Sequence, residues 1–245
     1  MPIVLVDSAS RDDTVEIART IAQRNSMKLS IICNSFPTVR SLAEGFRNCT
    51  TEFVLILSMD DELMHGYGVV AREWLIKEGK GVALNWALRL EDESGNYLGA
   101  RSPKWSRFRK LDLVRLAFKN LGTAPGCIVD RKIVTDSELF SLHSQSLIED
   151  QLMWYYLLQK GRIDRISNPH VLYRRSSTSL SQRQDSEFRF HVGYVLGFVA
   201  TRLKLETPVS ILRMLKGYGW TPEYRKGFKS GSAKAKINKI DVTNY

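Results

Sequence analysis

The chain has 245 residues, of which 43% are hydrophobic and 25% charged, and its formal net charge is +10. This length and composition predict one globular domain with a substantial core. No apolar run reaches the roughly 18 to 20 residues that cross a bilayer, and no signal-peptide pattern opens the sequence, so we expect a soluble or peripheral protein. Cys33, Cys49 and Cys127 form no C-x-x-C pair. Reduced thiols indicate a cytoplasmic location, with the inner face of the membrane as a second possibility.

Strand-like and helical patterns alternate from the first residues onward. Residues 2–6 predict a strand, and Asp12 or Asp13 can cap a helix with apolar residues up to Ala22. The next predicted elements are a strand over 29–33, a helix from Thr38, a strand over 53–57, a helix over 69–76 and a strand over 81–90 with a turn after it. Such alternation is typical of an α/β fold with a mainly parallel sheet and crossover helices.

The C-terminal part is basic, and we divide it into two segments. Residues 187–225 are expected to be helical and to pack on a domain formed by residues 1–186. Ile211, Leu212 and Leu215 could share one face, which would suit either an ordinary packed helix or a membrane-surface helix. Residues 226–245 begin with a stretch rich in Lys, Gly, Ser and Ala, which predicts a flexible basic tail.

A second group of basic residues lies within 101–110, where Trp105 and Phe108 stand among arginines and lysines. This segment suits either a loop that contacts phosphate and sugar or a solvated loop before a helix. The net charge favours anionic partners such as nucleotide-sugars, phosphorylated lipids, acidic membrane surfaces and nucleic acid. Since no recognised nucleic-acid-binding motif appears, we expect no nucleic-acid partner, although a basic nucleic-acid-binding protein remains an alternative.

The segment from Leu55 to Glu62 is an apolar strand that runs directly into Asp60 and Asp61. Open α/β sheets bind ligands beyond the carboxyl ends of their strands, where a carboxylate can hold Mg²⁺ or Mn²⁺ against phosphates. Acids at such a position can also cap the next helix or solvate a turn.

Four segments together resemble the family 2 inverting glycosyltransferases. These segments are residues 4–14 (VLVDSASRDDT), residues 53–61 (FVLILSMDD), residues 148–154 (IEDQLMW) and residues 161–181 (GRIDRISNPHVLYRRSSTSLS). The resemblance spans roughly residues 3 to 181 and implies a GT-A-like fold. It also implies a nucleotide-diphospho-sugar donor, a saccharide or lipid-linked saccharide acceptor, a divalent cation, and a role in bacterial polysaccharide or glycolipid synthesis.

On the donor side, the resemblance implies a role for several residues. Asp7 would accept a hydrogen bond from the nucleotide base, with Ser10 and Asp12 shaping the turn around it, although a turn-forming aspartate explains Asp7 as well. Asp60 would bind the cation that bridges the two phosphates. Ser58 could hydrogen-bond the ribose, and Asp61 would either support the cation ligand or contact the sugar. Arg174 or Arg175 could face the diphosphate.

On the acceptor side, Asp150 would be the general base, with Glu149 beside it. Adjacent acids at a helix start can equally be caps favoured by the helix dipole. The small-residue stretch from Thr123 to Cys127 resembles the turn that lines the acceptor side, and a simple tight turn explains it nearly as well.

Two departures from the family pattern weaken these expectations. Ser58 stands where the family usually has an acid, and the chain begins at what resembles the family's second strand. A missing first strand would leave a gap in the sheet unless another segment fills it, and the alternating run from Ile237 to Tyr245 is one candidate. A catalytically degenerate or truncated binding protein of the same fold is therefore an alternative function.

Overall fold

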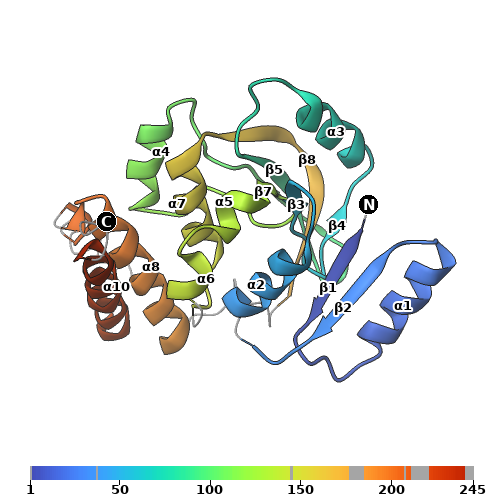
Figure 1. Ribbon diagram of the computed structural model, residues 1–245, viewed down its shortest axis with the longest axis horizontal. Helices are drawn as coiled ribbons and strands as arrows, with labels where there is room; N and C mark the ends of the chain where they lie inside the picture. Colours follow the sequence, from blue (N-terminus) through green and yellow to red (C-terminus); the bar gives the residue numbers. More distant parts are fainter. Residues whose placement is uncertain are drawn as a thin grey trace.

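A computed structural model describes residues 2–36, 38–143, 146–176, 185–206, 208–210 and 221–240 (Figure 1). The chain begins with β1 (Ile3–Asp7), α1 (Thr14–Arg24) and β2 (Leu29–Cys33). β1 and β2 pair in parallel, with Ile3 opposite Leu29 and Asp7 opposite Cys33, and they form a sheet of their own. The predicted strand, helix and strand are therefore confirmed. α1 buries Ala22 and leaves Ile17 and Ile21 exposed.

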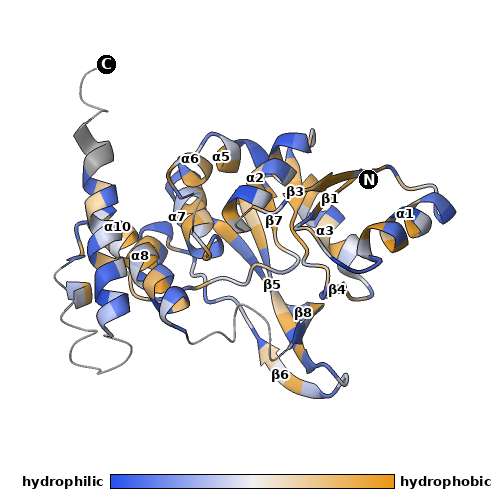
Figure 2. Cartoon of the chain, turned by 90° about the horizontal axis from the view of Figure 1, so that it is seen from below, coloured by the Kyte–Doolittle hydropathy of each residue, from blue (hydrophilic) through white to orange (hydrophobic). Residues whose placement is uncertain are grey.

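The second sheet is larger and has the strand order β3-β7-β5-β8-β4, with β6 paired to β5. Its strands are β3 (Phe53–Leu55), β4 (Glu62–Leu63), β5 (Ala83–Asp92), β6 (Tyr97–Arg101), β7 (Ile128–Asp130) and β8 (Ile163–Arg175). β8 is one long strand whose register against β5 shifts near Ala87. The β5–β6 hairpin projects from the body of the domain (Figure 2).

The pairing in this sheet is more mixed than the mainly parallel arrangement expected from the sequence. β5 and β8 are parallel, whereas β3 with β7, β7 with β5, β4 with β8 and β5 with β6 are antiparallel. A short turn joins β5 to β6, which allows only antiparallel pairing, because parallel neighbours need a long crossover. Within the described residues, no strand pair joins β1 and β2 to the larger sheet.

Most of the remaining helices pack around the larger sheet, and the last two extend the main core away from it (Figure 1). These helices are α2 (Thr38–Asn48), α3 (Tyr67–Ile76), α4 (Arg109–Leu116), α5 (Arg131–Thr135), α6 (Leu139–Leu142), α7 (Asp150–Lys160), α8 (Ser186–Arg202) and α10 (Pro222–Ile240). α7 is buried along most of its length and contributes Trp154, which packs edge-on against Trp105. The predicted α/β class is confirmed. No helix in the described ranges is long and apolar enough to span a bilayer.

The C-terminal helices correct two predictions. Residues 226–245 were expected to be a flexible basic tail, and the run from Ile237 to Tyr245 was one candidate for a missing strand, but the described residues 226–240 belong to α10. α10 packs on α8 through glycines: a Cβ on Gly231 would lie 1.9 Å from the carbonyl oxygen of Tyr194. Glycine lets the two backbones approach this closely, so its frequency here reflects packing rather than disorder. The apolar face predicted around Ile211 and the end of the 161–181 motif lie outside the described residues.

Candidate functional site

The acidic loop after β3 contains one buried and one exposed aspartate. Asp60 and Ser58 are exposed, whereas Asp61 is only 8% exposed. The backbone N–H of Asp61 donates to the carbonyl oxygen of Ser58 over 3.2 Å, which tightens the loop. The Asp61 Oδ1 accepts a 3.3 Å hydrogen bond from the backbone N–H of Arg174 on β8. The loop is therefore anchored to a strand more than 100 residues away in the sequence.

The second carboxylate oxygen of Asp61, Oδ2, is buried and has no hydrogen-bond partner among the residues that the structure describes. Burial, and then the charge of Asp60, raise the pKa of Asp61 to about 7, although the Arg174 N–H and the Ser58 hydroxyl oppose this shift. An unpaired buried oxygen next to a second carboxylate is a strained arrangement that a bound cation would relieve.

This pair of carboxylates fits the divalent cation that the sequence implied. Mg²⁺ is commonly held by one or two carboxylates, with substrate phosphates and water completing the coordination. Asp60 and Asp61 meet this requirement, with Ser58 as a neutral neighbour. A self-sufficient cage is not formed, because the described residues contain no group of three or more His, Cys, Asp or Glu side chains arranged around a metal position.

Arg174 lies at the rim of the acidic loop. Its Nη2 is 3.3 Å from the Glu62 Oε2, in an ion pair in which both side chains are largely exposed. The Arg174 guanidinium group is thus directed to Glu62 at the edge of the acidic loop. Because an exposed ion pair of this kind is weak, a diphosphate could compete for the guanidinium.

Glu149 and Asp150 stand at the start of α7. Glu149 occupies the N-cap position, but its side chain makes no capping hydrogen bond, so the capping alternative is not supported for this residue. Asp150 Oδ1 accepts a 2.7 Å hydrogen bond from the Gln151 N–H. Asp150 Oδ2 accepts a 2.5 Å hydrogen bond from the Asn120 side-chain amide.

Burial dominates the protonation of this acidic pair. Burial, and then the charge of Asp150, raise the pKa of Glu149 to about 8. The pKa of Asp150 is also raised by burial, but hydrogen bonds from Asn120 and Gln151 and the charge of Arg101 act against this rise. Burial therefore favours the protonated form of both acids, whereas the hydrogen bonds from Asn120 and Gln151 favour the ionised form of Asp150.

Sequence reasoning did not identify Asn120 or the buried Asn85. Asn85 lies within β5, where its Oδ1 accepts hydrogen bonds from Trp105 Nε1 (2.9 Å) and Thr123 N (3.1 Å). Its Nδ2 donates to the carbonyl oxygen of Thr123. Asn85 thus fixes the predicted turn at Thr123, while Asn120 accepts a 3.2 Å hydrogen bond from the Gly122 N–H. The available sequence signal was an asparagine within an apolar strand, because a buried amide there needs hydrogen-bond partners.

Backbone contacts connect the acidic loop to the Asp150 cluster. The N–H of Ile56, just before the loop, donates to the Cys127 carbonyl oxygen over 2.9 Å, and the Gly126 N–H donates to the Ile56 carbonyl oxygen over 2.8 Å. Burial, and then the negative charge of Asp150, raise the pKa of the Cys127 thiol, so this thiol lies close to the acid. The two acidic clusters therefore lie at the same end of the larger sheet.

Asp7 lies at the end of β1, in the separate two-stranded sheet. It is buried, and its Oδ2 accepts a 3.1 Å hydrogen bond from the Ser10 N–H. Asp12 is exposed and accepts hydrogen bonds from the Thr14 N–H (3.1 Å) and hydroxyl (2.5 Å). Ala9 adopts a left-handed conformation with φ of 63°. These residues shape one tight turn, but no hydrogen bond between described residues joins it to the other acids.

Comparison with known proteins gives one family match. Residues 2–135 match the family model for glycosyl transferase family 2. No curated protein sequence matches the chain. The structure of S. aureus TarS residues 1–349 in complex with UDP has a TM-score of 0.58 and 15% identity, and the alignment covers 98% of this chain and 82% of that one.

Two further solved structures are similar to the chain. The structure of S. aureus TarS 1–349 without a stated ligand gives a TM-score of 0.57 at the same 15% identity and the same coverage of 98% and 82%. The mannosyltransferase PcManGT from Pyrobaculum calidifontis, in complex with GDP-Man and Mn²⁺, has a TM-score of 0.47 at 13% identity, with 99% of this chain and 79% of that one covered. At such identities the TarS structures show a shared fold, and the expected GT-A-like architecture is confirmed.

Proposed function

Because the chain belongs to glycosyl transferase family 2, we propose that it transfers a sugar from a nucleotide-diphospho-sugar to an acceptor hydroxyl, with inversion at the anomeric carbon. The acceptor would be a saccharide or lipid-linked saccharide, as in bacterial polysaccharide or glycolipid synthesis. The observation that most supports this proposal is the Asp150 carboxylate, held by Asn120 at the start of α7. UDP in the TarS structure supports a nucleoside diphosphate leaving group.

In this mechanism Asp150 acts as the general base. The acceptor hydroxyl gives its proton to the Asp150 carboxylate, and its oxygen bonds to the anomeric carbon as the bond to the diphosphate breaks. The nucleoside diphosphate leaves with the electron pair of that bond. Burial raises the pKa of Asp150, which makes its carboxylate a stronger base, while the hydrogen bond from the Asn120 amide favours the ionised form.

Glu149 has a supporting role. Its pKa of about 8 keeps it mainly protonated at neutral pH, so it adds no second negative charge beside the base. A protonated carboxyl also has a hydrogen that it can donate to the acceptor or to Asp150. We assign the proton transfer to Asp150 alone.

Asp60 and Asp61 would hold a Mg²⁺ or Mn²⁺ ion, with Ser58 beside them and Arg174 at the rim. A bound cation would supply positive charge next to the two phosphates of the donor. The unpaired Oδ2 of Asp61 is the observation that supports this assignment. Arg174 would exchange its exposed contact with Glu62 for a phosphate oxygen.

Asp7, Ser10 and Asp12 would form the nucleotide end of the site. In this assignment the buried Asp7 accepts a hydrogen bond from the nucleotide base. The hydrogen bond from the Ser10 N–H holds the Asp7 carboxylate in place. Asp12 stabilises the turn through Thr14 and does not itself contact the nucleotide. A cytoplasmic location, which the unpaired cysteines favour, is part of the proposal.

Calorimetric titration with UDP, GDP and dTDP, with and without Mn²⁺, tests the donor site. We expect one nucleotide to bind more tightly with Mn²⁺, and Asp60→Ala to remove that gain. Asp136→Ala changes an exposed acid at the end of α5 and serves as the matched control. Absence of binding by the unchanged protein, or equal binding by Asp60→Ala, would contradict the proposed site.

A catalytically degenerate binding protein is the second candidate function. It is favoured by Ser58 in place of an acid and by the lack of a strand pair between the two sheets in the described part of the chain. Such a protein would bind a nucleoside diphosphate but would neither transfer nor hydrolyse the sugar. Turnover assays with the matching nucleotide-sugar separate the two functions.

A further inference from the structure

The segment from Arg101 to Lys119, which contains α4, is strongly basic. It has seven basic residues and one acid. That acid, Asp112, is buried, where it accepts a 2.7 Å hydrogen bond from the Ser106 N–H and pairs with Arg115 at 2.8 Å. The segment therefore exposes positive charge with no exposed carboxylate. The seven basic residues are Arg101, Lys104, Arg107, Arg109, Lys110, Arg115 and Lys119.

The same segment exposes large apolar side chains. Phe108 is 70% exposed, Leu111 48% and Val114 42%. Leu111 and Val114 are three positions apart, so they share the outward face of α4, while Leu116 is buried on the inward face. Exposed apolar groups within a basic surface are the combination found in helices that lie on membranes.

A shallow groove of about 580 Å³ lies beside this face. Its cations come from three elements: Lys104 from the loop after β6, Arg115 from α4 and Arg165 from β8. Ser102 and Ser106 also line the groove. Lysine and arginine side chains around an open groove suit a phosphate group.

We propose that the outward face of α4 docks on an anionic phospholipid bilayer. Phe108, Leu111 and Val114 enter the boundary between headgroups and acyl chains, while the surrounding basic residues bind lipid phosphates. The groove of Lys104, Arg115 and Arg165 accepts a headgroup. Apolar and basic side chains act together in this docking, so both kinds are required.

Other partners fit this face less well. A second copy of the chain, placed symmetrically on this surface, would bring two sets of seven cations together. Nucleic acid would use the cations and could stack a base on Phe108, but it gives the aliphatic Leu111 and Val114 no favourable contact. A lipid surface satisfies the charges and the aliphatic groups together.

The docking face lies close to the proposed general base. Near the start of α4, Arg109 Nη1 donates a 3.1 Å hydrogen bond to the Gln159 carbonyl oxygen, at the far end of α7. Beyond the end of α4, Asn120 contacts Asp150 at the beginning of α7. α4 therefore runs antiparallel beside α7. If the proposed function is right, docking at α4 brings Asp150 near the membrane, which favours a lipid-linked saccharide as acceptor.

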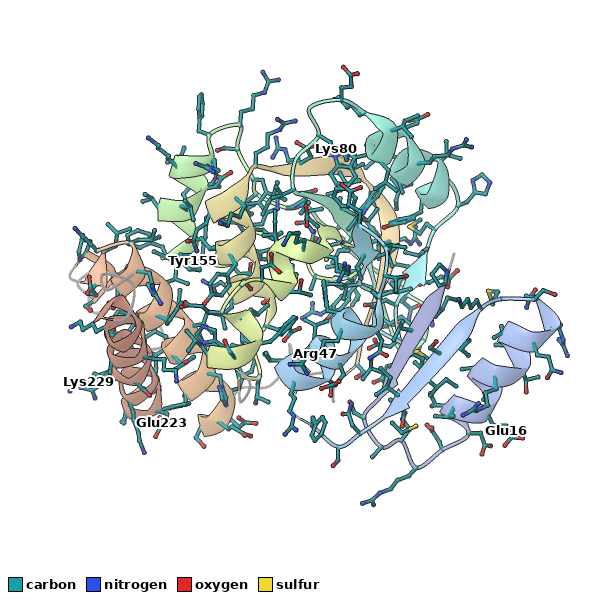
Figure 3. The ribbon with its side chains drawn as sticks, in the orientation of Figure 1. Glu16, Arg47, Lys80, Tyr155, Glu223 and Lys229 are labelled. Carbon is teal, nitrogen blue, oxygen red and sulfur yellow. The ribbon has the colours of Figure 1, made fainter. Side chains whose placement is uncertain are left out.

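α10 provides the comparison surface. The sequence left membrane contact through the basic C-terminal segment as one alternative, and within this segment α10 exposes Arg225, Lys226, Lys229 and Lys236. Lys229 lies on the outer side of α10 (Figure 3). Residues 222–236 of this helix, however, expose no large hydrophobic side chain. Residues 222–236 of α10 can add electrostatic attraction but expose no apolar anchor like that of α4.

Co-sedimentation with vesicles tests the proposal. The full chain would be mixed with phosphatidylcholine vesicles, with and without phosphatidylglycerol, at low and high salt. The first variant, Arg107→Glu with Lys110→Glu, reverses two charges at α4. The second, Phe108→Ser with Leu111→Ser, removes two apolar anchors, and the matched control, Lys226→Glu with Lys229→Glu, makes the same charge change on α10.

We expect binding only to the anionic vesicles and weaker binding at high salt. The charge variant at α4 should bind at least roughly thirty-fold more weakly, and the apolar variant at least about tenfold more weakly. The α10 control should lose less affinity for anionic vesicles than either α4 variant. All altered residues are exposed, so circular dichroism should show an unchanged fold.

Three results would overturn the proposal. The first is that the unchanged protein does not bind anionic vesicles. The second is that only the α10 control loses vesicle binding. The third is that the apolar variant binds vesicles fully and the protein binds RNA equally tightly. UDP titration of the same variants tests the proposed function separately, because the residues proposed to bind the nucleotide are unaltered. Failed vesicle binding with intact nucleotide binding would reject the membrane surface alone.

Discussion

The Asn120 side-chain amide donates a 2.5 Å hydrogen bond to Asp150 Oδ2 across 30 residues of sequence. This contact opposes the effect of burial, which favours the protonated form of Asp150. Asn120 is itself held by the Gly122 N–H, and Gly122 packs closely against Trp154 of α7. The proposed base is therefore positioned by a loop that is clamped against the helix from which the base projects.

Asn120→Ala should lower kcat by roughly tenfold and shift the acid limb of the pH profile to higher pH. The amide stabilises the ionised carboxylate, so its loss raises the pKa of Asp150 further. The pH dependence of kcat/KM measures this shift. A lower rate with an unmoved pH profile would mean that Asn120 only supports the loop.

Asp150→Asn and Glu149→Gln form a matched pair. Asp150→Asn removes the proposed base and should reduce kcat by about 10²–10⁴-fold with unchanged UDP binding. Glu149→Gln should retain most activity at pH 7, because glutamine resembles the protonated carboxyl that a pKa of about 8 predicts. Initial rates with a nucleotide-sugar donor, together with UDP titrations, compare the two. Equal losses would indicate that both acids take part directly in the transfer.

Binding of Mn²⁺ with nucleotide should weaken as the pH falls below about 7, because protonated Asp61 is a poor ligand. Titrations at several pH values, with Asp61→Asn as the variant without a titrating group, measure this dependence. A binding constant for the unchanged protein that stays constant from pH 8 to 6 would exclude Asp61 as a ligand.

Asp61→Asn should also stabilise the metal-free protein at pH 8. The folded-state pKa lies above the unfolded value of 3.8, so stability from this group is present at low pH and is lost as the pH rises through about 7. Above that pH the free energy of unfolding of the variant should be higher by roughly 1–2 kcal/mol, a figure reduced for solvent screening. Thermal unfolding at pH 5 and pH 8 tests this, and a gain of equal size at both values would contradict the assignment.

Gly231→Ala should destabilise the contact between α8 and α10 by about 1–3 kcal/mol, because the new Cβ would overlap the Tyr194 carbonyl oxygen. Gly68→Ala is the matched control in α3, where no atom lies within 4 Å of the added carbon. Helix propensity there predicts a gain of up to about 1 kcal/mol. Thermal unfolding followed by circular dichroism compares the variants, and a neutral Gly231→Ala would mean that the helices separate easily.

Two parts of the chain are candidates for membrane contact. The sequence left the basic C-terminal segment as one possible contact, and its apolar face around Ile211 lies outside the described residues, while residues 222–236 of α10 present charge without exposed large apolar groups. Exposure of Phe108 and Leu111 is a property of how α4 packs on α7, and the local sequence does not reveal it. The vesicle experiment distinguishes the two surfaces directly.

The sequence by itself determined the order of strands and helices in the first half of the chain and the acids that follow β3 and begin α7. These features depend on neighbouring residues, whose spacing sets a period of about 2 or 3.6. The tertiary structure decided what local spacing cannot encode: the antiparallel pairs, the burial of Asp61 against Arg174, and the contacts of Asn85 and Asn120. It also decided that α10 is a helix, because its glycines gain their role only when α8 lies against them. Such contacts join residues far apart in sequence, so they exist only once the chain has folded.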